Sequence, residues 1–157
     1  IGTVGSDDKA ALAKANGATH VINYKTEDFV KRTKEITGGA GVDVVYDGVG
    51  KDTFPGSLDC LKPMGLWASF GNASGPVPPF DLGMLAAKGS LYATRPSLVT
   101  YTAKKEDNIA NANDLFEVVS KGIVKIAVNH TYPLKEAAQA HRDLEGRKTT
   151  GSIVLLP

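Results

Sequence analysis

The chain has 157 residues, of which 42% are hydrophobic and 22% are charged, and these values are ordinary for one globular domain. Eighteen Lys and Arg residues against seventeen Asp and Glu residues give a formal net charge of +1, which argues against nucleic acid or an anionic membrane surface as a partner. A single cysteine excludes an internal disulfide and a Cys-rich zinc site, and no run of about 18 apolar residues could span a bilayer. We therefore expect a soluble protein of a reducing compartment, the cytoplasm.

Short apolar runs alternate with helical stretches through the first two thirds of the chain. The expected strands cover residues 1–4, 20–24, 42–46, 66–70 and 90–94. The expected helices cover residues 7–16, 29–36, 47 to about 61, and 82–87. Because the strands are apolar on both faces, this alternation indicates right-handed βαβ crossovers around a parallel sheet. We therefore expect an α/β fold with a Rossmann-type doubly wound parallel sheet, an architecture typical of nucleotide-binding proteins.

The pattern changes from about residue 104. We expect a longer helix over residues 106–120, a strand over 123–128, a helix over 135–144 and a closing strand over 152–156. This mixed ending predicts a second sheet that the segment joins but cannot complete alone. The chain also begins in the middle of a strand-like pattern without an initiator Met. We therefore expect a fragment of a longer protein, whose first strand and Gly-rich turn precede Ile1.

Two glycine-rich turns are candidates for phosphate-binding loops. Residues 38–41 (GGAG) follow a helix and precede a strand, which is the wrong side of the unit, so they predict a helix stop. Residues 48–50 (GVG) follow a strand and open a helix, but Thr53 stands where the next glycine is expected. The second turn is therefore a weak match to the dinucleotide-binding pattern.

The end of the first expected strand carries the features that select a nicotinamide cofactor. In a dinucleotide-binding fold, an acidic residue at this place binds the ribose 2′-OH of NAD, whereas small or basic residues admit the 2′-phosphate of NADP. Gly5 and Ser6 occupy this place, with Lys9 one turn into the helix and Tyr24 at the end of the next strand. Together they could surround a phosphate. The alternative is a Ser6 helix cap, a solvated Lys9 and a half-buried Tyr24.

Neither metal binding nor nucleophilic catalysis is expected within this segment. His20, His130 and His141 are scattered, without the spacing of metal ligands. Cys60 lies among leucines at the end of an expected helix, and no neighbouring cation in the sequence would lower its pKa. We expect a buried thiol there.

Several strings in this chain resemble one known family: GTVGSDDKAALAKANGA, INYKTEDF, VVYDGVGKDTF, SLDCLKPMGL, SFGNASGPV, KGSLYATRPSL, YPLKEAAQAH and TTGSIVLLP. They resemble the C-terminal half of the zinc-free, NADPH-dependent quinone oxidoreductases, which are the ζ-crystallin-like branch of the medium-chain dehydrogenase/reductase superfamily. The resemblance covers essentially the whole chain in register, and SFGNASG and TRPSL are its most specific parts.

The resemblance implies a partial Rossmann NADPH-binding domain over residues 1–124 and a tail over residues 125–157 that belongs to a GroES-like catalytic domain. It assigns no catalytic residue and no metal ligand to this segment. Asp7 and Asp8 depart from the pattern, because they add negative charge beside the phosphate pocket. The implied NADPH-binding residues are Gly5, Ser6, Lys9 and Tyr24 at the 2′-phosphate, Val49 at the adenosine, Phe70, Gly71, Asn72, Ala73, Arg95, Pro96 and Ser97 on the nicotinamide side, and Arg147 from the tail.

The leading hypothesis is the cofactor-binding portion of an oxidoreductase that transfers hydride from NADPH to a quinone or a similar electron-poor acceptor, with the fragment alone inactive. The alternative is a non-catalytic, crystallin-like NADPH-binding module. A third hypothesis, a self-sufficient nucleotide-binding domain, meets the objection that the first strand is central in the order 3-2-1-4-5-6.

A homodimer is also expected, through the edge strand from Ser90 to Thr94. The segment is apolar or β-prone and has no edge-blocking charge before Arg95, so it would leave a row of amides unpaired in a monomer.

Overall fold

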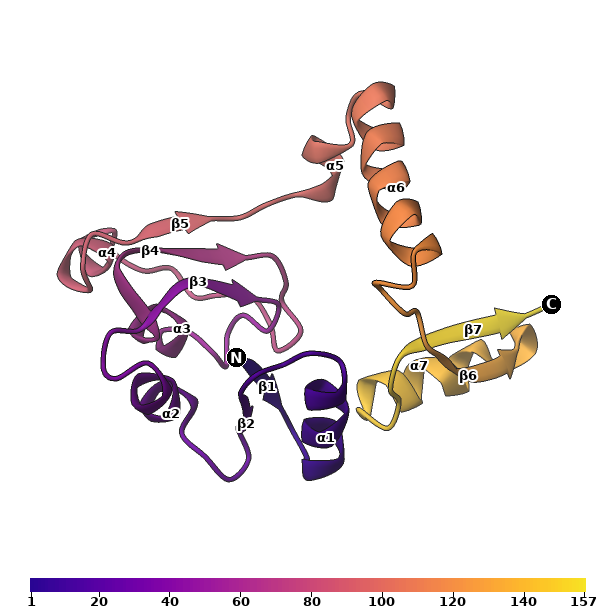
Figure 1. Ribbon diagram of the computed structural model, residues 1–157, viewed down its shortest axis with the longest axis horizontal. Helices are drawn as coiled ribbons and strands as arrows, with labels where there is room; N and C mark the ends of the chain where they lie inside the picture. The colour runs from indigo at the N-terminus through magenta and orange to yellow at the C-terminus, as the bar shows by residue number, and fades with distance from the viewer. The chain divides into compact units, whose positions relative to one another are not determined.

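The computed structural model describes residues 1–157 as two compact units, Ile1–Leu98 and Val99–Pro157. Figure 1 labels their helices and strands. The strands form three sheets, β1-β2, β3-β4-β5 and β6-β7, and all the pairings are parallel. The predicted domain boundary after residue 124 falls inside the second unit and stays a prediction about a longer protein.

The first unit opens with a two-stranded sheet. Strand β1 (Gly2–Val4) pairs with β2 (Val21–Asn23), and helix α1 (Asp7–Ala15) connects them. Ser6 caps α1, because its Oγ accepts a hydrogen bond from the backbone N–H of Lys9 at 3.4 Å. The side chain of Ile22, in the middle of β2, is fully buried. The predicted strand, turn and helix are therefore confirmed at this end of the chain.

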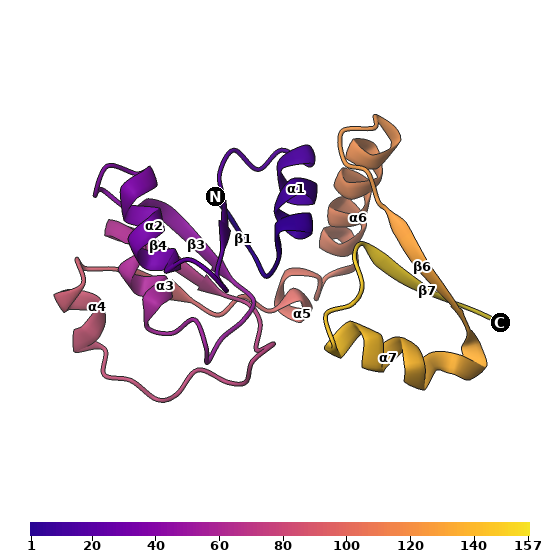
Figure 2. The same ribbon diagram turned by 90° about the horizontal axis from the view of Figure 1, so that it is seen from below.

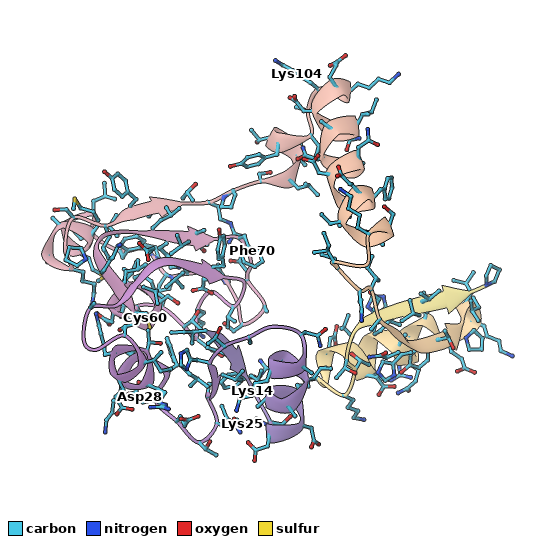
Figure 3. The ribbon with its side chains drawn as sticks, in the orientation of Figure 1. Lys14, Lys25, Asp28, Cys60, Phe70 and Lys104 are labelled. Atoms are coloured by element: carbon cyan, nitrogen blue, oxygen red, sulfur yellow. The ribbon has the colours of Figure 1, made fainter.

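Helix α2 (Phe29–Ile36) has the predicted bounds. Asp28, labelled in Figure 3, caps it, since its Oδ1 accepts from the backbone N–H of Val30 at 2.9 Å and of Lys31 at 3.0 Å. The GGAG turn then ends the helix, as predicted. Its Gly41 has φ +86°, and a Cβ there would lie 2.7 Å from the carbonyl oxygen of Cys60, so only glycine fits this close approach.

The central sheet contains β3 (Val42–Asp47), β4 (Leu61–Ser69) and β5 (Tyr92–Thr94), and helix α4 (Gly83–Ala87) lies between β4 and β5 in the chain. The side chains of β5 are all exposed at one edge of this sheet. Tyr46 of β3 is also 77% exposed. The strands expected to be apolar on both faces therefore have exposed side chains in β3 and β5.

The helix predicted from residue 47 to about 61 is wrong. Residues 48–55 form turns, and only α3 (Gly56–Asp59) is helical. Gly50 has φ +89°, the Lys51 N–H donates to the carbonyl of Gly75, and Pro55 has no N–H to donate to a helix. Strand β4 also begins five residues earlier than predicted, because Leu61 already pairs with Val42. The register then shifts between Val42 and Val44, so that Val44 pairs with Leu66.

The core of the first unit lies against the β3-β4-β5 sheet. Its buried side chains are Leu58, Leu61, Trp67 and Leu91. The rings of Phe54 and Phe80 pack against Trp67 with centroids 5.7 and 6.1 Å away. Helices α2 and α3 contact each other beside this core, as Figure 2 shows from a second direction. Each large side chain buried here contributes about 1.5–3 kcal/mol, so this core fixes the strand ends that carry the loops described below.

The second unit contains α6 (Lys105–Ser120), β6 (Val128–Pro133), a short 3-10 helix (Leu134–Glu136), α7 (Ala137–Glu145) and β7 (Ser152–Leu156); the short α5 (Leu98–Tyr101) spans the division between the units. Strand β7 has its predicted bounds. The strand predicted over residues 123–128 is wrong, because the N–H groups of Ile123 and Val124 bind the carbonyl of Val118 and close the end of α6. Helix α7 contacts β6, where the hydroxyl of Tyr132 donates to Asp143 at 3.1 Å.

The predicted α/β class with parallel sheets is confirmed. The expected order 3-2-1-4-5-6 would make the β1-β2 pair strands 2 and 3, and β3-β4-β5 strands 4, 5 and 6, and this assignment stays a prediction. No hydrogen bonds join these two sheets. No helix has the length and apolar character needed to cross a membrane.

Candidate functional site

The residues implied by the resemblance come mainly from loops at the carboxyl ends of the parallel strands in the first unit. This edge is where α/β sheets bind ligands. Residues 5–6 follow β1, Tyr24 follows β2, residues 48–50 follow β3, residues 70–75 follow β4 and residues 95–97 follow β5. Arg147 lies in the second unit, after α7, so its contribution to the site stays a prediction.

Gly5 and Tyr24 lie against each other at the end of the β1-β2 pair. A Cβ at residue 5 would be 2.6 Å from the Tyr24 hydroxyl oxygen and 3.0 Å from Cζ. The phenol therefore occupies the space that an acidic side chain at residue 5 would need. Asp7, which departs from the family pattern, has its Oδ1 2.9 Å from the side-chain amide of Asn23, which donates to it. Ser6 caps α1, which is the alternative to a phosphate contact that the sequence left open for this residue.

The turn after β3 is hydrogen-bonded to the loop after β4. Ser74 donates through its backbone N–H to the carbonyl of Val49 at 2.9 Å, and its Oγ reaches the same carbonyl at 2.9 Å. On either side, Ala73 N–H donates to Gly48 O at 3.1 Å, and Lys51 N–H donates to Gly75 O at 3.1 Å. Val49 and the 70–73 segment are therefore brought together, although they are far apart in the sequence.

Phe70 lies at the carboxyl ends of β3 and β4 in Figure 3 and is 55% exposed. Its ring lies over Gly48, where a Cβ would be 3.1 Å from the Phe70 Cζ. Gly71 approaches the same turn still more closely: a Cβ at residue 71 would overlap the Gly48 carbonyl oxygen and lie 2.7 Å from Gly48 Cα. The exposed ring of Phe70 therefore lies at a strand end where the backbones of Gly48 and Gly71 are in contact.

Arg95 ties the end of β5 to the same loop. Its Nη1 donates to the carbonyl of Ser69 at 2.9 Å and to the carbonyl of Gly71 at 3.1 Å. The guanidinium thus orders the start of the 70–75 loop. Pro96 and Ser97 follow directly, and their predicted contacts with a cofactor stay predictions.

An open cavity of about 620 Å³ lies beside this loop. Its walls come from β4, β5 and the proline-rich segment that precedes α4. Apolar side chains dominate the walls, and the polar lining comes from the loop ends. The lining residues are Trp67, Val77, Pro78, Pro79, Phe80, Leu82 and Ala93, with Ser69, Asn72, Thr94 and Arg95.

Asp47, which the sequence analysis did not single out as a site residue, is the buried charge at this edge. It is 4% exposed, at the last position of β3. Burial alone would raise its pKa, but hydrogen bonds from Gly50, Ser57, Val49 and Thr53 outweigh burial and hold the pKa of Asp47 below its usual value. The sequence signal that could have indicated a buried, hydrogen-bonded Asp47 is the Asp-Gly pair at a strand end, followed by hydroxyl side chains at residues 53 and 57.

Cys60 is a buried thiol, as predicted. Burial raises its pKa, and the nearby Lys34 only partly opposes this rise. The expectation that no cation lies close to Cys60 is therefore wrong, although the conclusion that this cysteine is not an activated nucleophile stands.

Residues 16–155 match a family described as zinc-binding dehydrogenase. The chain is 55% identical over 159 residues to a quinone oxidoreductase of Salmonella typhimurium, covering 100% of this chain and 49% of that protein. It is 48% identical over 161 residues to a 2-haloacrylate reductase of a Burkholderia species, covering 100% of this chain and 47% of that protein.

The structure is similar to that of Escherichia coli quinone oxidoreductase complexed with NADPH. The TM-score is 0.96 with 52% identity, over 100% of this chain and 49% of that chain. The chain thus spans about half the length of the relatives it matches.

The description of the matching family implies zinc, but the residues of this chain do not fit a zinc site. No three His, Cys, Asp or Glu side chains are grouped closely enough to hold a metal ion. The single cysteine is buried, and the Nε2 of His130 accepts a hydrogen bond from the backbone N–H of Thr150 at 3.2 Å. The residues of this chain are therefore given no role in holding zinc.

Proposed function

The chain belongs to the zinc-binding dehydrogenase family of the medium-chain dehydrogenase/reductase superfamily, and from this we propose that it is the cofactor-binding portion of an NADPH-dependent oxidoreductase that reduces a quinone or a similar electron-poor acceptor. The observation that carries the proposal is the likeness to the NADPH complex of a protein 52% identical to this chain, with a TM-score of 0.96. A cytoplasmic location is part of the same proposal.

When bound, NADPH supplies the hydride, and the residues of this chain bind and orient it. Gly5, Lys9 and Tyr24 would hold the 2′-phosphate, in a pocket from which Tyr24 excludes an acidic side chain at residue 5. Val49 would contact the adenosine. The nicotinamide side would be bounded by residues 70–73 and 95–97, which the Arg95 hydrogen bonds hold in place.

The acceptor is identified by steady-state turnover of the full-length protein. Loss of NADPH absorbance is followed with a quinone, with 2-haloacrylate or with no acceptor. We expect quinone-dependent oxidation. The 2-haloacrylate arm is included because one relative bears that substrate in its name. Tight NADPH binding without turnover of either acceptor would instead support the non-catalytic, crystallin-like alternative.

Lys9→Ala is expected to weaken NADPH binding while leaving NADH binding unchanged. Lys9 lies in the first turn of α1 near Gly5 and Ser6, where a cation favours the phosphate that only NADPH carries. The expected loss is about 1–2 kcal/mol, the scale of one charge-assisted hydrogen bond. The matched control is Lys14→Ala in the last turn of the same helix, labelled in Figure 3, which should bind both cofactors as the unaltered protein does. Equal weakening of NADPH and NADH binding by Lys9→Ala, measured by calorimetry, would contradict the proposed pocket.

A dimer is proposed through β5. Its side chains are exposed at an edge of the central sheet, and a second copy could pair with its free backbone groups. Tyr92→Lys is expected to shift the full-length protein toward monomer in light scattering, because a charge at an edge opposes strand pairing. Ala11→Lys, at an exposed position of helix α1 and outside every strand, is the control and should leave the dimer intact. A purely monomeric unaltered protein at micromolar concentration would disprove this assembly.

A further inference from the structure

We propose that Asp47 is a positioning residue for NADPH: its buried carboxylate fixes the turn after β3 and, through that turn, the loop after β4. The inference rests on the proposed function and deepens it, because both segments contain residues proposed to contact the cofactor. Asp47 itself is only 4% exposed, so it acts through its neighbours.

The carboxylate of Asp47 is surrounded by hydrogen-bond donors from three parts of the chain. Oδ1 accepts the backbone N–H groups of Val49 at 2.9 Å and Gly50 at 3.1 Å. Oδ2 accepts from the Ser57 hydroxyl at 2.8 Å and from the indole N–H of Trp67 at 3.3 Å. The Thr53 hydroxyl lies 3.0 Å from Oδ1 and 2.8 Å from Oδ2. One side chain therefore joins the turn, α3 and β4.

These hydrogen bonds require that both oxygens of the Asp47 side chain act as hydrogen-bond acceptors. The two backbone N–H groups at Oδ1 and the indole N–H at Oδ2 can only donate. An asparagine at residue 47 has the same shape, but its NH₂ group would have to face one of these sets of donors. Asp47→Asn therefore leaves at least one buried N–H without an acceptor, either in the turn or at Trp67, and weakens the link that joins the turn to α3 and β4.

Movement of that turn would reach the loop after β4 directly. The backbone N–H of Phe70 donates to the Asp47 carbonyl at 2.9 Å, and Ala73 N–H donates to the Gly48 carbonyl at 3.1 Å. Ser74 N–H donates to the Val49 carbonyl at 2.9 Å. The 70–73 segment therefore packs against the same short turn that the Asp47 carboxylate holds. The electron-accepting substrate has no proposed contact with this turn.

The test is Asp47→Asn in the full-length protein. We expect the dissociation constant and the KM for NADPH to rise about tenfold, the effect of one lost hydrogen bond to a charged group. The kcat at saturating NADPH and the KM for the acceptor should change little. The control for general destabilisation is Leu61→Ala, a cavity at the amino end of β4, which should lower the melting temperature without changing the KM for NADPH.

A second pair of variants keeps the test informative if Asp47→Asn does not fold. Thr53→Val and Ser57→Ala each remove one hydroxyl from the same carboxylate, but only the Thr53 hydroxyl also lies 3.0 Å from the carbonyl of Gly50 in the turn after β3. We expect Thr53→Val to raise the KM for NADPH more than Ser57→Ala does. Equal effects of this pair, or an unchanged NADPH affinity in Asp47→Asn, would overturn the inference and leave the proposed function intact. Absence of NADPH binding by the unaltered protein would instead overturn the proposed function.

Discussion

Gly71→Ala is expected to weaken NADPH binding by the full-length protein about 5- to 150-fold. A Cβ at residue 71 would overlap the carbonyl oxygen of Gly48 and lie 2.7 Å from its Cα and 2.8 Å from its carbonyl carbon. All of these are main-chain atoms, so no side chain can rotate away, and Asp47 holds the turn that contains them. The turn after β3 and the loop after β4 must therefore separate. Overpacking of this kind costs about 1–3 kcal/mol and occasionally more.

The matched control is Gly38→Ala in the turn that ends α2. Gly38 has φ +60°, and nothing lies within 4 Å of the Cβ that alanine would add. Its cost should be only the backbone term, about 1–2 kcal/mol, with NADPH affinity unchanged. Calorimetric titration with NADPH, together with thermal melting, separates the two variants. Binding by Gly71→Ala at the affinity of the unaltered protein would contradict the placement of the nicotinamide-side loop.

The 157-residue polypeptide, expressed alone, is expected to associate or remain partly unfolded and to bind NADPH weakly. In the second unit, the side chains of Phe116, Ile123, Ile126 and Val128 are between 52% and 71% exposed. Burial of four such side chains is worth about 6–12 kcal/mol, comparable to the net stability of a domain. The β1-β2 and β3-β4-β5 sheets are also not joined by strand pairing, so each has edge strands with unpaired backbone groups.

Size-exclusion chromatography with light scattering and a thermal melt measure this outcome. The double variant Ile123→Lys with Ile126→Lys should increase the soluble fraction, because both exposed positions lie outside the strands. Lys substitutions at Ala11 and Ala15, which are exposed positions of helix α1, serve as the comparison for added charge alone. A soluble monomer that melts cooperatively and binds NADPH with micromolar affinity would contradict the expectation.

Local signals in the sequence were sufficient for much of the fold. Helix α2 has the predicted bounds because Asp28 caps its first turn and a glycine turn ends it. Strand β7 also has its predicted bounds, since a β-prone run follows directly on a glycine. The predicted helix cap at Ser6, the buried thiol of Cys60 and the membership of the family were likewise readable from residue types and their order.

The tertiary structure decided the features that depend on residues far apart in the chain. The helix predicted from residue 47 to 61 failed because Gly50 has φ +89° and the Lys51 N–H binds the carbonyl of Gly75, in the loop after β4, instead of a carbonyl in the preceding turn. The strand predicted over 123–128 failed because its first amides close α6. The contact between Gly48 and Gly71, and the two carbonyls that Arg95 binds, were equally hidden. A sequence shows which groups can donate and accept, but only the folded chain determines which of them meet.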